Sequence, residues 1–352
     1  MAKANSAVES IVKSLQDKFG EENITYLGNK KAVAMERISS GSFSLDNALG
    51  GGWPVGRIIE IMGPESSGKT TVCYHAMAEA QKLGWVVALV DTEYSHDPVY
   101  SGNIGVDNDS LIVSQPEDGT QALDILIQML DAGVKLAVVD SVASLLPREE
   151  AESDDFGKAT VGRQAQLMSK ALRKLTPAIG RNKAIVIFTN QLRQKIGVMY
   201  GNPETTAGGE SLKYYASIRC RVSTVSGSTD ESKRTKVKVI KNKTAVPFKE
   251  AEFNIIFGVG VDKINDIVEG AIDCGLFNKG PGGVYTSKIL TDNGVDKIRG
   301  REKLLSWIKE QGEDFIKKLS DEAHEYVANQ KNNPQTQENE EEQQEEDTVG
   351  EI

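Results

Sequence analysis

Continuous runs of apolar residues, separated by segments with helical periodicity, dominate the chain before residue 217. The runs are short and lie between polar or turn-forming residues, as expected of strands that are buried on both faces of a sheet. They cover residues 57–62, 85–90, 136–139 and 184–188. In the intervening segments apolar residues recur every three or four positions, which is the period of an amphipathic helix. Strands that alternate with helices predict an α/β fold with a mainly parallel sheet covered on both sides.

The N-terminal segment has an amphipathic pattern of its own. Residues 6–19 are predicted to form a helix, with Ser6 and Glu9 as an N-terminal capping box and Gly20 as the C-terminal stop. A short strand is predicted at residues 24–27. One helix and one strand cannot bury their apolar faces alone. They are expected to dock either on the rest of their own chain or on a neighbouring subunit, and the pattern does not choose between the two.

Beyond residue 216 the pattern changes to shorter elements. Residues 217–225, 235–241 and 253–257 are predicted strands joined by turns, so antiparallel strands are expected to extend the sheet. From about residue 262 to residue 326, helices are mixed with a Gly-Pro-Gly-Gly turn, which predicts a small α/β domain. Residues 331–352 contain almost no apolar residue and cannot bury enough surface to fold, so they are predicted to be a disordered acidic tail.

A glycine-rich loop connects the first buried strand to a predicted helix, after a Ser- and Gly-rich stretch at residues 38–56 that is predicted to be loop-rich. The loop matches the pattern G-x-x-x-x-G-K-[ST] in full; it reads Gly63-Pro64-Glu65-Ser66-Ser67-Gly68-Lys69-Thr70. The backbone N–H groups of such a loop surround a phosphate chain at the positive end of the helix. Lys69 is placed to reach the β- and γ-phosphates, and the Thr70 hydroxyl to bind Mg²⁺. A chance glycine turn is the alternative, which the strand–loop–helix context disfavours.

Three polar residues follow predicted strands. Asp140 ends the strand at residues 136–139, where an ATPase of this kind places the carboxylate that holds Mg²⁺ through water. Glu93 lies just past the strand at residues 85–90, and Gln191 ends the strand at residues 184–188. The carboxyl ends of neighbouring parallel strands share one crevice. Glu93 is therefore a candidate to activate the attacking water, although a solvated loop carboxylate is the alternative. The neutral amide of Gln191 can sense the γ-phosphate and pass its presence into the next segment.

Two groups of basic residues suggest a nucleic-acid partner. The first group consists of Arg173, Lys174, Arg193 and Lys195. Arg193 and Lys195 lie in segment 192–209, which is long and contains several glycines, so this segment is predicted to be a mobile functional loop.

The second basic group spans residues 233–243. Lys236 and Lys238 alternate there with valines, the period of a half-buried strand, so a merely solvated strand face is the alternative. Lys241 and Lys243 are also placed to act on the phosphates of a neighbouring subunit, as arginine fingers do.

Composition restricts the class of protein. The net charge of the 352 residues is −10, but much of the acidity lies at the C-terminal end, so the remainder does not exclude nucleic acid as a partner. The three cysteines are scattered and lack C-x-x-C spacing, which is typical of small buried side chains in a reducing compartment. No apolar run approaches about 18 residues and no signal core begins the chain. A soluble, cytoplasmic protein without a membrane partner is expected.

Together these features resemble the RecA recombinases of bacteria and their phages over nearly the whole chain. Four stretches carry the resemblance: residues 63–71, Val138-Val139-Asp140-Ser141-Val142-Ala143, residues 195–206, and Lys238-Val239-Ile240-Lys241-Asn242-Lys243. A generic kinase with the same phosphate loop would not carry the last two.

The resemblance implies a fold and a function. The fold is a RecA-like P-loop ATPase core with a mainly parallel central sheet, an N-terminal helix–strand arm that packs on the adjacent subunit, and a small C-terminal α/β domain. The implied boundaries are 1–34 for the arm, 35–262 for the core, 263–330 for the C-terminal domain and 331–352 for the tail. The function is a DNA-dependent ATPase that forms helical filaments on single-stranded DNA, pairs it with homologous duplex and exchanges strands in recombination and repair. Self-cleavage of LexA-like repressors in the DNA-damage (SOS) response and a single-strand-binding protein as partner are further implications.

The resemblance also implies residue roles, with ATP and Mg²⁺ as cofactors. Catalysis involves Lys69, Glu93, Gln191, Lys241 and Lys243, the two last acting across the subunit joint. Nucleotide binding involves Gly63, Pro64, Glu65, Ser66, Ser67, Gly68, Lys69, Thr70, Thr71, Asp97, Tyr100 and Phe257, and the metal involves Thr70 and Asp140. DNA binding involves Arg163, Ser169, Arg173, Arg193, Lys195, Ile196, Gly208 and Gly209, mostly from the segments 152–165 and 192–209.

Some positions depart from the family pattern. Phe257 stands where many relatives have Tyr, which keeps a stacking platform for adenine but loses a hydroxyl. Residues 211–215 read Ser-Leu-Lys-Tyr-Tyr instead of the commoner Ala-Leu-Lys-Phe-Tyr, and residues 154–158 are atypical of a first DNA loop. These changes suggest a divergent member, for which a phage origin is one explanation, and they support repressor cleavage less than strand exchange.

Two other functions share part of the pattern. A hexameric ring motor such as a helicase would have the phosphate loop and Asp140, but not the N-terminal arm or residues 202–206. Electron microscopy with ATP and single-stranded DNA separates filaments from closed rings. A DNA-coating protein that does not hydrolyse ATP is the third reading, and Glu93 argues against it.

The acidic tail can be tested directly. Near a basic DNA entry surface, residues 331–352 would compete with duplex DNA through their negative charge, whereas a tail that only keeps the protein soluble would not. Deleting residues 331–352 is expected to speed the capture of a labelled duplex. An unchanged capture rate would support the solubilising role.

Overall fold

The computed structural model of the chain describes residues 2–20, 24, 35–152, 162–194 and 204–331. The chain divides into two compact units, Met1–Glu36 and Arg37–Ile352, which are described separately.

The first unit contains α1 (Ala2–Phe19), which ends where Gly20 adopts a φ of 90°. The N–H of Gly20 donates to the Gln16 carbonyl at 2.8 Å, so the predicted C-terminal stop is confirmed. The predicted capping box is wrong, because the helix begins at Ala2 and Ser6 lies inside it; alanine and lysine before Ser6 are good helix formers. The apolar residues Ile11 and Phe19 are exposed. Most of the strand predicted at 24–27 lies outside the described residues.

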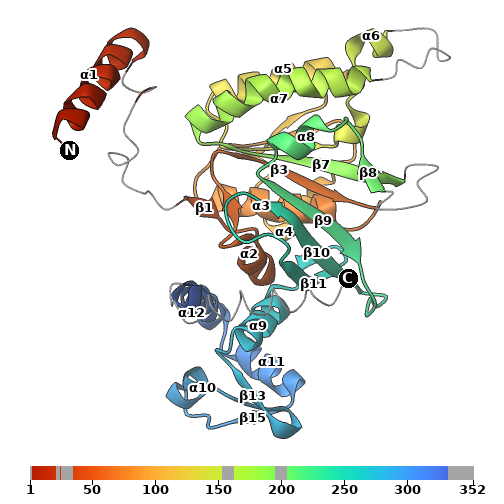
Figure 1. The fold of residues 1–352 in the computed structure, drawn as a ribbon. Coiled ribbons are helices and arrows are strands. Elements are labelled where there is room, and N and C mark those ends of the chain that lie inside the picture. The colour runs from red at the N-terminus through yellow and green to blue at the C-terminus, as the bar shows by residue number, and fades with distance from the viewer. Residues whose placement is uncertain (1, 21–23, 25–34, 153–161, 195–203, 332–352) are drawn as a thin grey trace, which may run out of the picture. The chain divides into compact units, whose positions relative to one another are not determined.

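A large sheet forms the centre of the second unit (Figure 1). Its strands, in spatial order, are β12 (Gly260–Val261), β11 (Glu250–Ile256), β10 (Ser232–Asn242), β9 (Ile218–Thr224), β3 (Arg57–Gly63), β7 (Ile185–Gln194), β6 (Leu136–Asp140), β4 (Val87–Asp91) and β5 (Ile112–Ser114), with β8 (Glu204–Thr206) beside β7. From β9 to β5 the pairs are parallel, and from β9 to β12 they are antiparallel. Both the parallel centre and its antiparallel extension were predicted from the sequence.

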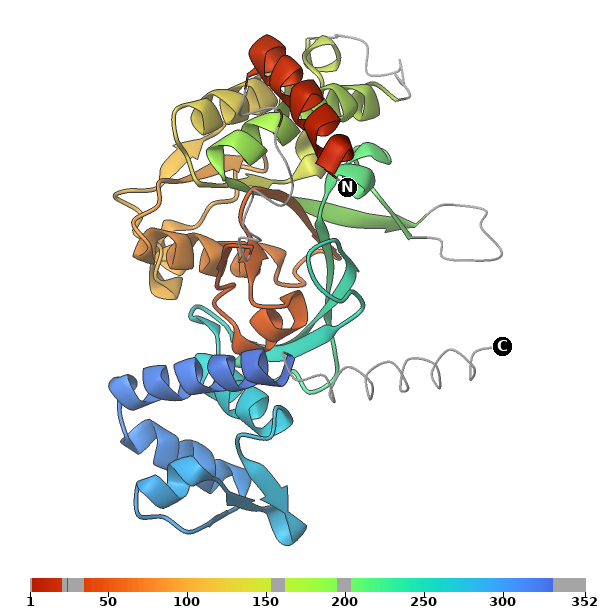
Figure 2. The same cartoon turned by 60° about the vertical axis from the view of Figure 1, so that its left-hand side comes forward.

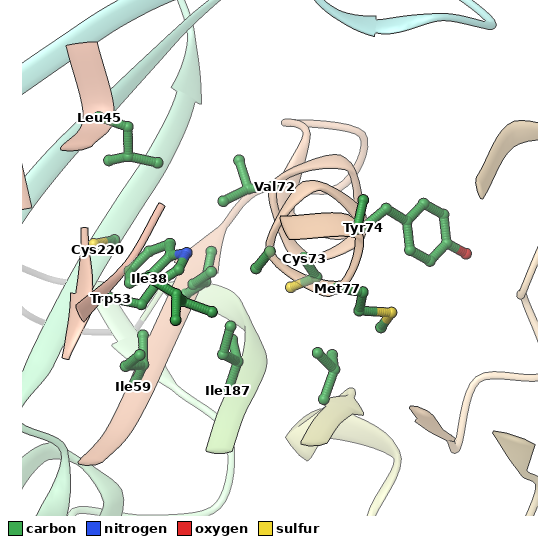
Figure 3. Close-up of a cluster of buried hydrophobic side chains, with 14 of the residues drawn as sticks. Ile38, Leu45, Trp53, Ile59, Val72, Cys73, Tyr74, Met77, Ile187 and Cys220 are labelled. Carbon is green, nitrogen blue, oxygen red and sulfur yellow. The ribbon is translucent and has the colours of Figure 1, made fainter. Parts of the chain in front are cut away.

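Helices cover both faces of this sheet (Figure 1). They are α2 (Phe43–Leu49), α3 (Lys69–Lys82), α4 (Pro98–Ile104), α5 (Gly119–Asp131), the 3₁₀ turn η2 (Val142–Ser144), α6 (Arg148–Ala151), α7 (Arg163–Asn182) and α8 (Ser211–Tyr215). Successive strand residues supply opposite faces: Ile59 packs in the cluster beneath α3, and Ile58 packs in the cluster beneath α5 and α7. Figure 3 shows the first cluster, in which Val72, Cys73 and Met77 of α3 pack with Ile59 and Ile187 of the sheet. Two such faces explain the long apolar runs in the central strands.

The stretch predicted to be loop-rich at residues 38–56 contains a helix. α2 lies between β1 (Arg37–Ile38) and β2 (Trp53–Pro54), which pair antiparallel. Ser42 caps the helix by accepting from the Leu45 N–H at 3.2 Å, and Gly50 ends it with a φ of 86°. The prediction was therefore wrong for Phe43–Leu49. The capping Ser and the terminal Gly, which suggested a loop, are the stop signals of a short helix.

The C-terminal part has a hydrophobic cluster of its own. It consists of α9 (Lys263–Asp273), β13 (Asn278–Gly280), the 3₁₀ turn η3 (Pro281–Gly283), β14 (Val284–Thr286), α10 (Lys288–Asp292), β15 (Ile298–Arg299), α11 (Arg301–Glu310) and α12 (Glu313–Lys331). Phe43 of α2 joins this cluster, and the Asp266 carboxylate accepts from the Phe43 N–H at 2.6 Å. Figure 2 shows α12 running beside α2 and α9. The predicted boundaries between the four parts of the chain stay predictions.

Two further observations concern the whole fold. Cys73 and Cys220 are buried, as predicted, and Cys274 is half-buried. Among the described residues, no helix is both long enough and apolar enough to cross a bilayer.

The joint between α2 and α9 leaves no room beside Gly270, where an added Cβ would lie 2.0 Å from Cδ1 of Phe43. Gly270→Ala is expected to lower the free energy of unfolding by about 1–3 kcal/mol, because it overpacks this contact. Gly180 of α7 has open space around it, so Gly180→Ala is expected to raise the free energy by about 0.5–1 kcal/mol through helix propensity alone. Urea unfolding measures both. Equal effects of the two changes would contradict the packing at the joint.

Candidate nucleotide and DNA site

The phosphate loop, residues 63–70, leaves β3 and enters α3 through two unusual backbone positions. Ser66 has a φ of 54° and Gly68 a φ of 104°. An added Cβ at Gly68 would lie 2.7 Å from Cδ1 of Ile255, and one at Gly63 would lie 2.3 Å from the Val222 carbonyl oxygen. Backbone at Val222 leaves no space for a side chain at Gly63, whereas the positive φ favours glycine at Gly68. The loop places its N–H groups at the N-terminal end of a 14-residue helix, which favours binding of an anion.

Lys69 is the first residue of α3 and bends back over the loop. Its ammonium donates to the Gly63 carbonyl at 3.2 Å and to the Pro64 carbonyl at 2.7 Å. Burial lowers the pKa of Lys69, and the carboxylates of Asp140 and Glu93 oppose this shift. The positive charge is thus held at the mouth of the loop by backbone carbonyls.

Asp140, at the end of β6, is 6% exposed. Its two carboxylate oxygens accept from the Thr70 hydroxyl at 2.8 Å and from the Thr189 hydroxyl at 2.5 Å. Burial raises the pKa of Asp140, and the two hydroxyl donors counteract this rise. Sequence reasoning missed Thr189. It lies within β7, directly after the apolar run 184–188, and this polar position beside Asp140 was the available signal.

Glu93 and Gln191 meet beside Asp140, as the shared crevice at the ends of parallel strands predicts. The Gln191 side-chain amide donates to Glu93 Oε1 at 3.3 Å, and the Ser141 hydroxyl donates to the same oxygen. The Glu93 N–H donates to the Asp140 carbonyl at 3.3 Å. The structure therefore brings together the loop, Asp140, Glu93 and Gln191. Ser141 was missed as a candidate, although it adjoins Asp140 in the sequence.

The residues expected to meet adenine lie around α4. The Asp97 carboxylate caps this helix by accepting from the Val99 N–H at 2.9 Å, and the Tyr100 hydroxyl lies 2.8 Å from the Thr71 hydroxyl of α3. Burial raises the pKa of Tyr100. Phe257 follows β11 and is 52% exposed. The residue after Phe257, Gly258, lies close to α4, because the side-chain amide of Asn103 in that helix donates to the Gly258 carbonyl at 2.9 Å.

Within the described part of their own chain, Lys241 and Lys243 donate to carbonyls of α8 and not to the phosphate loop. The Lys241 ammonium donates to the Lys213 carbonyl at 2.5 Å and to the Tyr214 carbonyl at 3.2 Å, and that of Lys243 donates to Tyr214 at 3.1 Å. These carbonyls lie near the C-terminal end of α8, which is exposed at Tyr214. Burial, followed by repulsion from Lys243, lowers the pKa of Lys241 to about 8.

Most of the DNA-binding candidates that the structure describes lie on α7 or on the segment after β8. Arg163 pairs with Glu149 at 3.3 Å, and Arg173 is exposed and donates to the Ser169 hydroxyl at 3.2 Å. The N–H of Gly208 donates to the Gln164 side chain at 3.2 Å, and Gly209 packs against α7 at Ala165. Arg193 lies within β7, whereas Lys195 and Ile196 lie outside the described residues.

Gln164 is a third residue that sequence reasoning missed. Besides accepting from Gly208, its amide donates to the Val142 carbonyl at 2.8 Å and to the Leu145 carbonyl at 3.2 Å. It therefore links the segment after β6 to the segment after β8, beside the start of α7. A polar residue in the first turn of a helix is common, so the sequence around Gln164 did not indicate this contact.

The segment predicted to be a loop at residues 192–209 begins in β7 and contains β8, which ends at Thr206. β7 continues through Gln191 to Gln194, and Leu192 pairs antiparallel with Thr206 of β8. The prediction that Gln191 ends its strand was therefore wrong. The pairing of β7 with β8 was not predicted, because the end of β7 is polar and its strand character depends on its pairing partner.

The exposed face of the basic run 233–243 is paired with acidic residues of β11. Lys238 lies 3.2 Å from Glu250, Arg234 lies 3.1 Å from Glu252, and Lys236 contacts both glutamates. This arrangement favours a solvated strand face over a nucleic-acid surface for these three residues.

The fold and the site define a class. A phosphate loop between β3 and α3, a buried carboxylate at the end of β6 and a carboxylate–amide pair in the adjoining crevice are the parts of a P-loop ATPase with a RecA-like sheet.

Comparisons with known proteins agree with this class. A sequence model of the RecA N-terminal domain family matches residues 6–262. Protein RecA of Nostoc punctiforme is 48% identical over 320 residues, which cover 89% of this chain and 87% of that protein. Protein RecA of Trichodesmium erythraeum is 46% identical over 327 residues, covering 92% and 89%. Protein RecA of a Nocardioides species is 49% identical over 286 residues, covering 80% and 81%.

The chain belongs to the RecA family. It is accordingly a recombinase of homologous recombination and DNA repair, and a nucleotide-binding, DNA-dependent ATPase. DNA binding and filament formation follow from the same family. The matches favour this function over a ring motor or a non-hydrolysing coating protein.

The position of Glu93 leads to a test of its role. Glu93→Gln keeps the size of the side chain but removes the base, so ATP turnover is expected to fall by roughly 10²–10⁴-fold while nucleotide binding is retained. Glu117→Gln, which neutralises an exposed carboxylate elsewhere, should leave turnover unchanged. Normal turnover by Glu93→Gln would remove Glu93 from the catalytic role.

Proposed function

We propose that ATP binds at the joint between two identical protomers of a filament on single-stranded DNA. One protomer supplies the phosphate loop and the crevice, and its neighbour supplies Lys241 and Lys243. One observation carries this proposal: the described contacts gather the phosphate loop, Asp140, Glu93 and Gln191 within one protomer, but hold Lys241 and Lys243 on the carbonyls of α8. In this proposal the site of a single protomer is incomplete without its neighbour.

The residues fit Mg²⁺ as the metal cofactor. The Thr70 hydroxyl and an Asp140 carboxylate oxygen lie 2.8 Å apart at the loop, and Mg²⁺ prefers oxygen ligands of this kind. Thr70 would hold the ion directly and Asp140 would hold it through water. When bound, the ion supplies positive charge that offsets the negative charge of the phosphates. Lys69 adds a second positive charge from the mouth of the loop.

Glu93 and Gln191 would have two separate roles, activation of water and coupling to DNA. Glu93 would orient and deprotonate the attacking water. Gln191 donates to Glu93 at 3.3 Å and directly precedes the β7–β8 hairpin, which starts at Leu192. A change in the position of Gln191 would thus be passed into the hairpin. This contact supports Gln191 as the residue that couples the γ-phosphate to the DNA-facing segments.

DNA would lie against α7 and the segments that flank it. The proposed contacts are Arg163, Ser169, Arg173, Arg193, Lys195, Ile196, Gly208 and Gly209. Arg163 and Arg173 are exposed, and Gln164 links the flanking segments beside them. Because contacts to backbone phosphates release counterions, binding would weaken steeply with salt.

Further partners complete the proposal. The arm, residues 1–34, would pack on the adjacent protomer, which is supported by the exposed apolar residues Ile11 and Phe19 of α1. Adenine would contact Asp97, Tyr100 and Phe257. A LexA-like repressor and a single-strand-binding protein are proposed partners on the basis of the resemblance, and the cytoplasm is the proposed location.

A mixing experiment tests the shared site. Lys69→Ala disables the loop of each protomer, and Lys241→Ala with Lys243→Ala disables the residues offered to the neighbour, so each variant alone is expected to lose ATP turnover. In a head-to-tail filament of both variants, about a quarter of the joints combine an intact loop with intact lysines. The mixture is therefore expected to recover turnover on single-stranded DNA.

A matched control removes two lysines from the exposed face of the same strand. Lys236→Ala with Lys238→Ala changes the same charge without touching the joint, and should hydrolyse ATP normally. A mixture no more active than its two components, or full activity of the Lys241→Ala, Lys243→Ala variant, would contradict a site shared between protomers.

A further inference from the structure

Lys233 of β10 contacts the phosphate loop from a strand distant in sequence. Its ammonium donates to the Ser66 carbonyl, 167 residues away along the chain. The side chain is half-buried, and burial lowers its pKa. Neighbouring cations of β10 behave differently, because Arg234, Lys236 and Lys238 pair with glutamates of β11. Lys233 is thus set apart from the solvated face of its own strand.

The register of the sheet places Lys233 on the face that supports the loop. Lys233 lies opposite Ile255 of β11, and Thr235 lies opposite Phe253. Residues directly opposite each other project to the same face, and Ile255, Thr235 and Phe253 are all buried. Ile255 is also the residue that fills the space beside Gly68. The loop therefore rests on the β10–β11 pair, near Ser66 and at Gly68.

The contact with Ser66 has a consequence for the next amide. The peptide bond between Ser66 and Ser67 is trans, and in a planar trans peptide the C=O and N–H point to opposite sides. Because Lys233 draws the Ser66 carbonyl toward β10, the Ser67 N–H points away from β10. A cation on the carbonyl also polarises the amide and strengthens its N–H as a donor.

We propose that Lys233 is a positioning residue for the phosphate loop: it fixes the Ser66–Ser67 peptide so that the Ser67 N–H donates to the nucleotide phosphates. The inference rests on the proposed nucleotide site. β10 also carries Lys241 near its other end, and Lys243 directly follows the strand. The same strand would then orient the loop of its own protomer and reach the nucleotide of the next.

The test measures the dissociation constant of a fluorescent ADP without DNA, so that the loop is probed separately from Lys241 and Lys243. Lys233→Gln is expected to raise this constant roughly threefold to tenfold, which is the size of one ordinary net hydrogen bond. Lys233→Arg keeps a cationic donor and should restore binding to within about twofold. Lys238→Gln removes the same charge from the opposite face and should bind as the unaltered protein does.

Steady-state turnover on single-stranded DNA supplies a readout that loss of structure would not reproduce. An N–H that contacts the phosphates before and during the reaction provides uniform binding, so Lys233→Gln should raise KM for ATP and leave kcat nearly unchanged. Thermal unfolding of each variant checks that the fold is retained. If Lys233→Gln proved unstable, Lys233→Arg would be compared with the unaltered protein instead. A loss of ADP binding by Lys233→Arg at unchanged stability would overturn the inference.

The outcomes separate this inference from the proposed site. Lys69→Ala serves as the reference: if it binds ADP normally, the proposed nucleotide site itself is wrong. If Lys69→Ala loses binding but Lys233→Gln keeps it, the positioning role of Lys233 is overturned and the site stands. Equal weakening by Lys233→Gln and Lys238→Gln would also overturn it, because bulk charge would then explain the effect.

Discussion

The buried carboxylate of Asp140 is the constraint on which the rest of the site depends. A charged group that is 6% exposed is costly unless it is hydrogen-bonded. Thr70 and Thr189 meet this requirement by donating to its two oxygens. These bonds tie the first turn of α3 to β7 across the end of β6. The loop that holds phosphates and the strand that carries Gln191 are therefore mechanically linked through one side chain.

The antiparallel half of the sheet extends this link beyond the crevice. β10 lies two strands from β3 in the sheet, contacts the phosphate loop through Lys233 and carries Lys241 at its other end, where the ammonium rests on α8. Nucleotide bound between protomers would thus engage both ends of β10, one in each neighbouring site. β10 is paired with both neighbours from Thr235 to Lys238, and its register with β9 shifts between Val239 and Lys241, next to the end that would reach the neighbouring site.

Sequence patterns predicted the features that depend on residues close together in the sequence. The strands β3, β4, β6 and β7 could be predicted because burial on both faces leaves a continuous apolar run, and the phosphate loop because its residues are contiguous. The rest depends on partners distant in sequence. α2 was hidden by its own capping residues, the β7–β8 hairpin by polar strand ends, and the contact of Lys233 with Ser66 by the separation of their segments. The residue roles at the site stay predictions, since position alone does not establish chemistry.

The most direct measurement is the ratio of ATP turnover with and without single-stranded DNA, in the unaltered protein and in Gln191→Ala. If nucleotide and DNA communicate through the crevice, DNA should stimulate the unaltered protein strongly and Gln191→Ala hardly at all, while both still bind nucleotide. Equal stimulation of the two proteins, or none in the unaltered protein, would contradict coupling through β7.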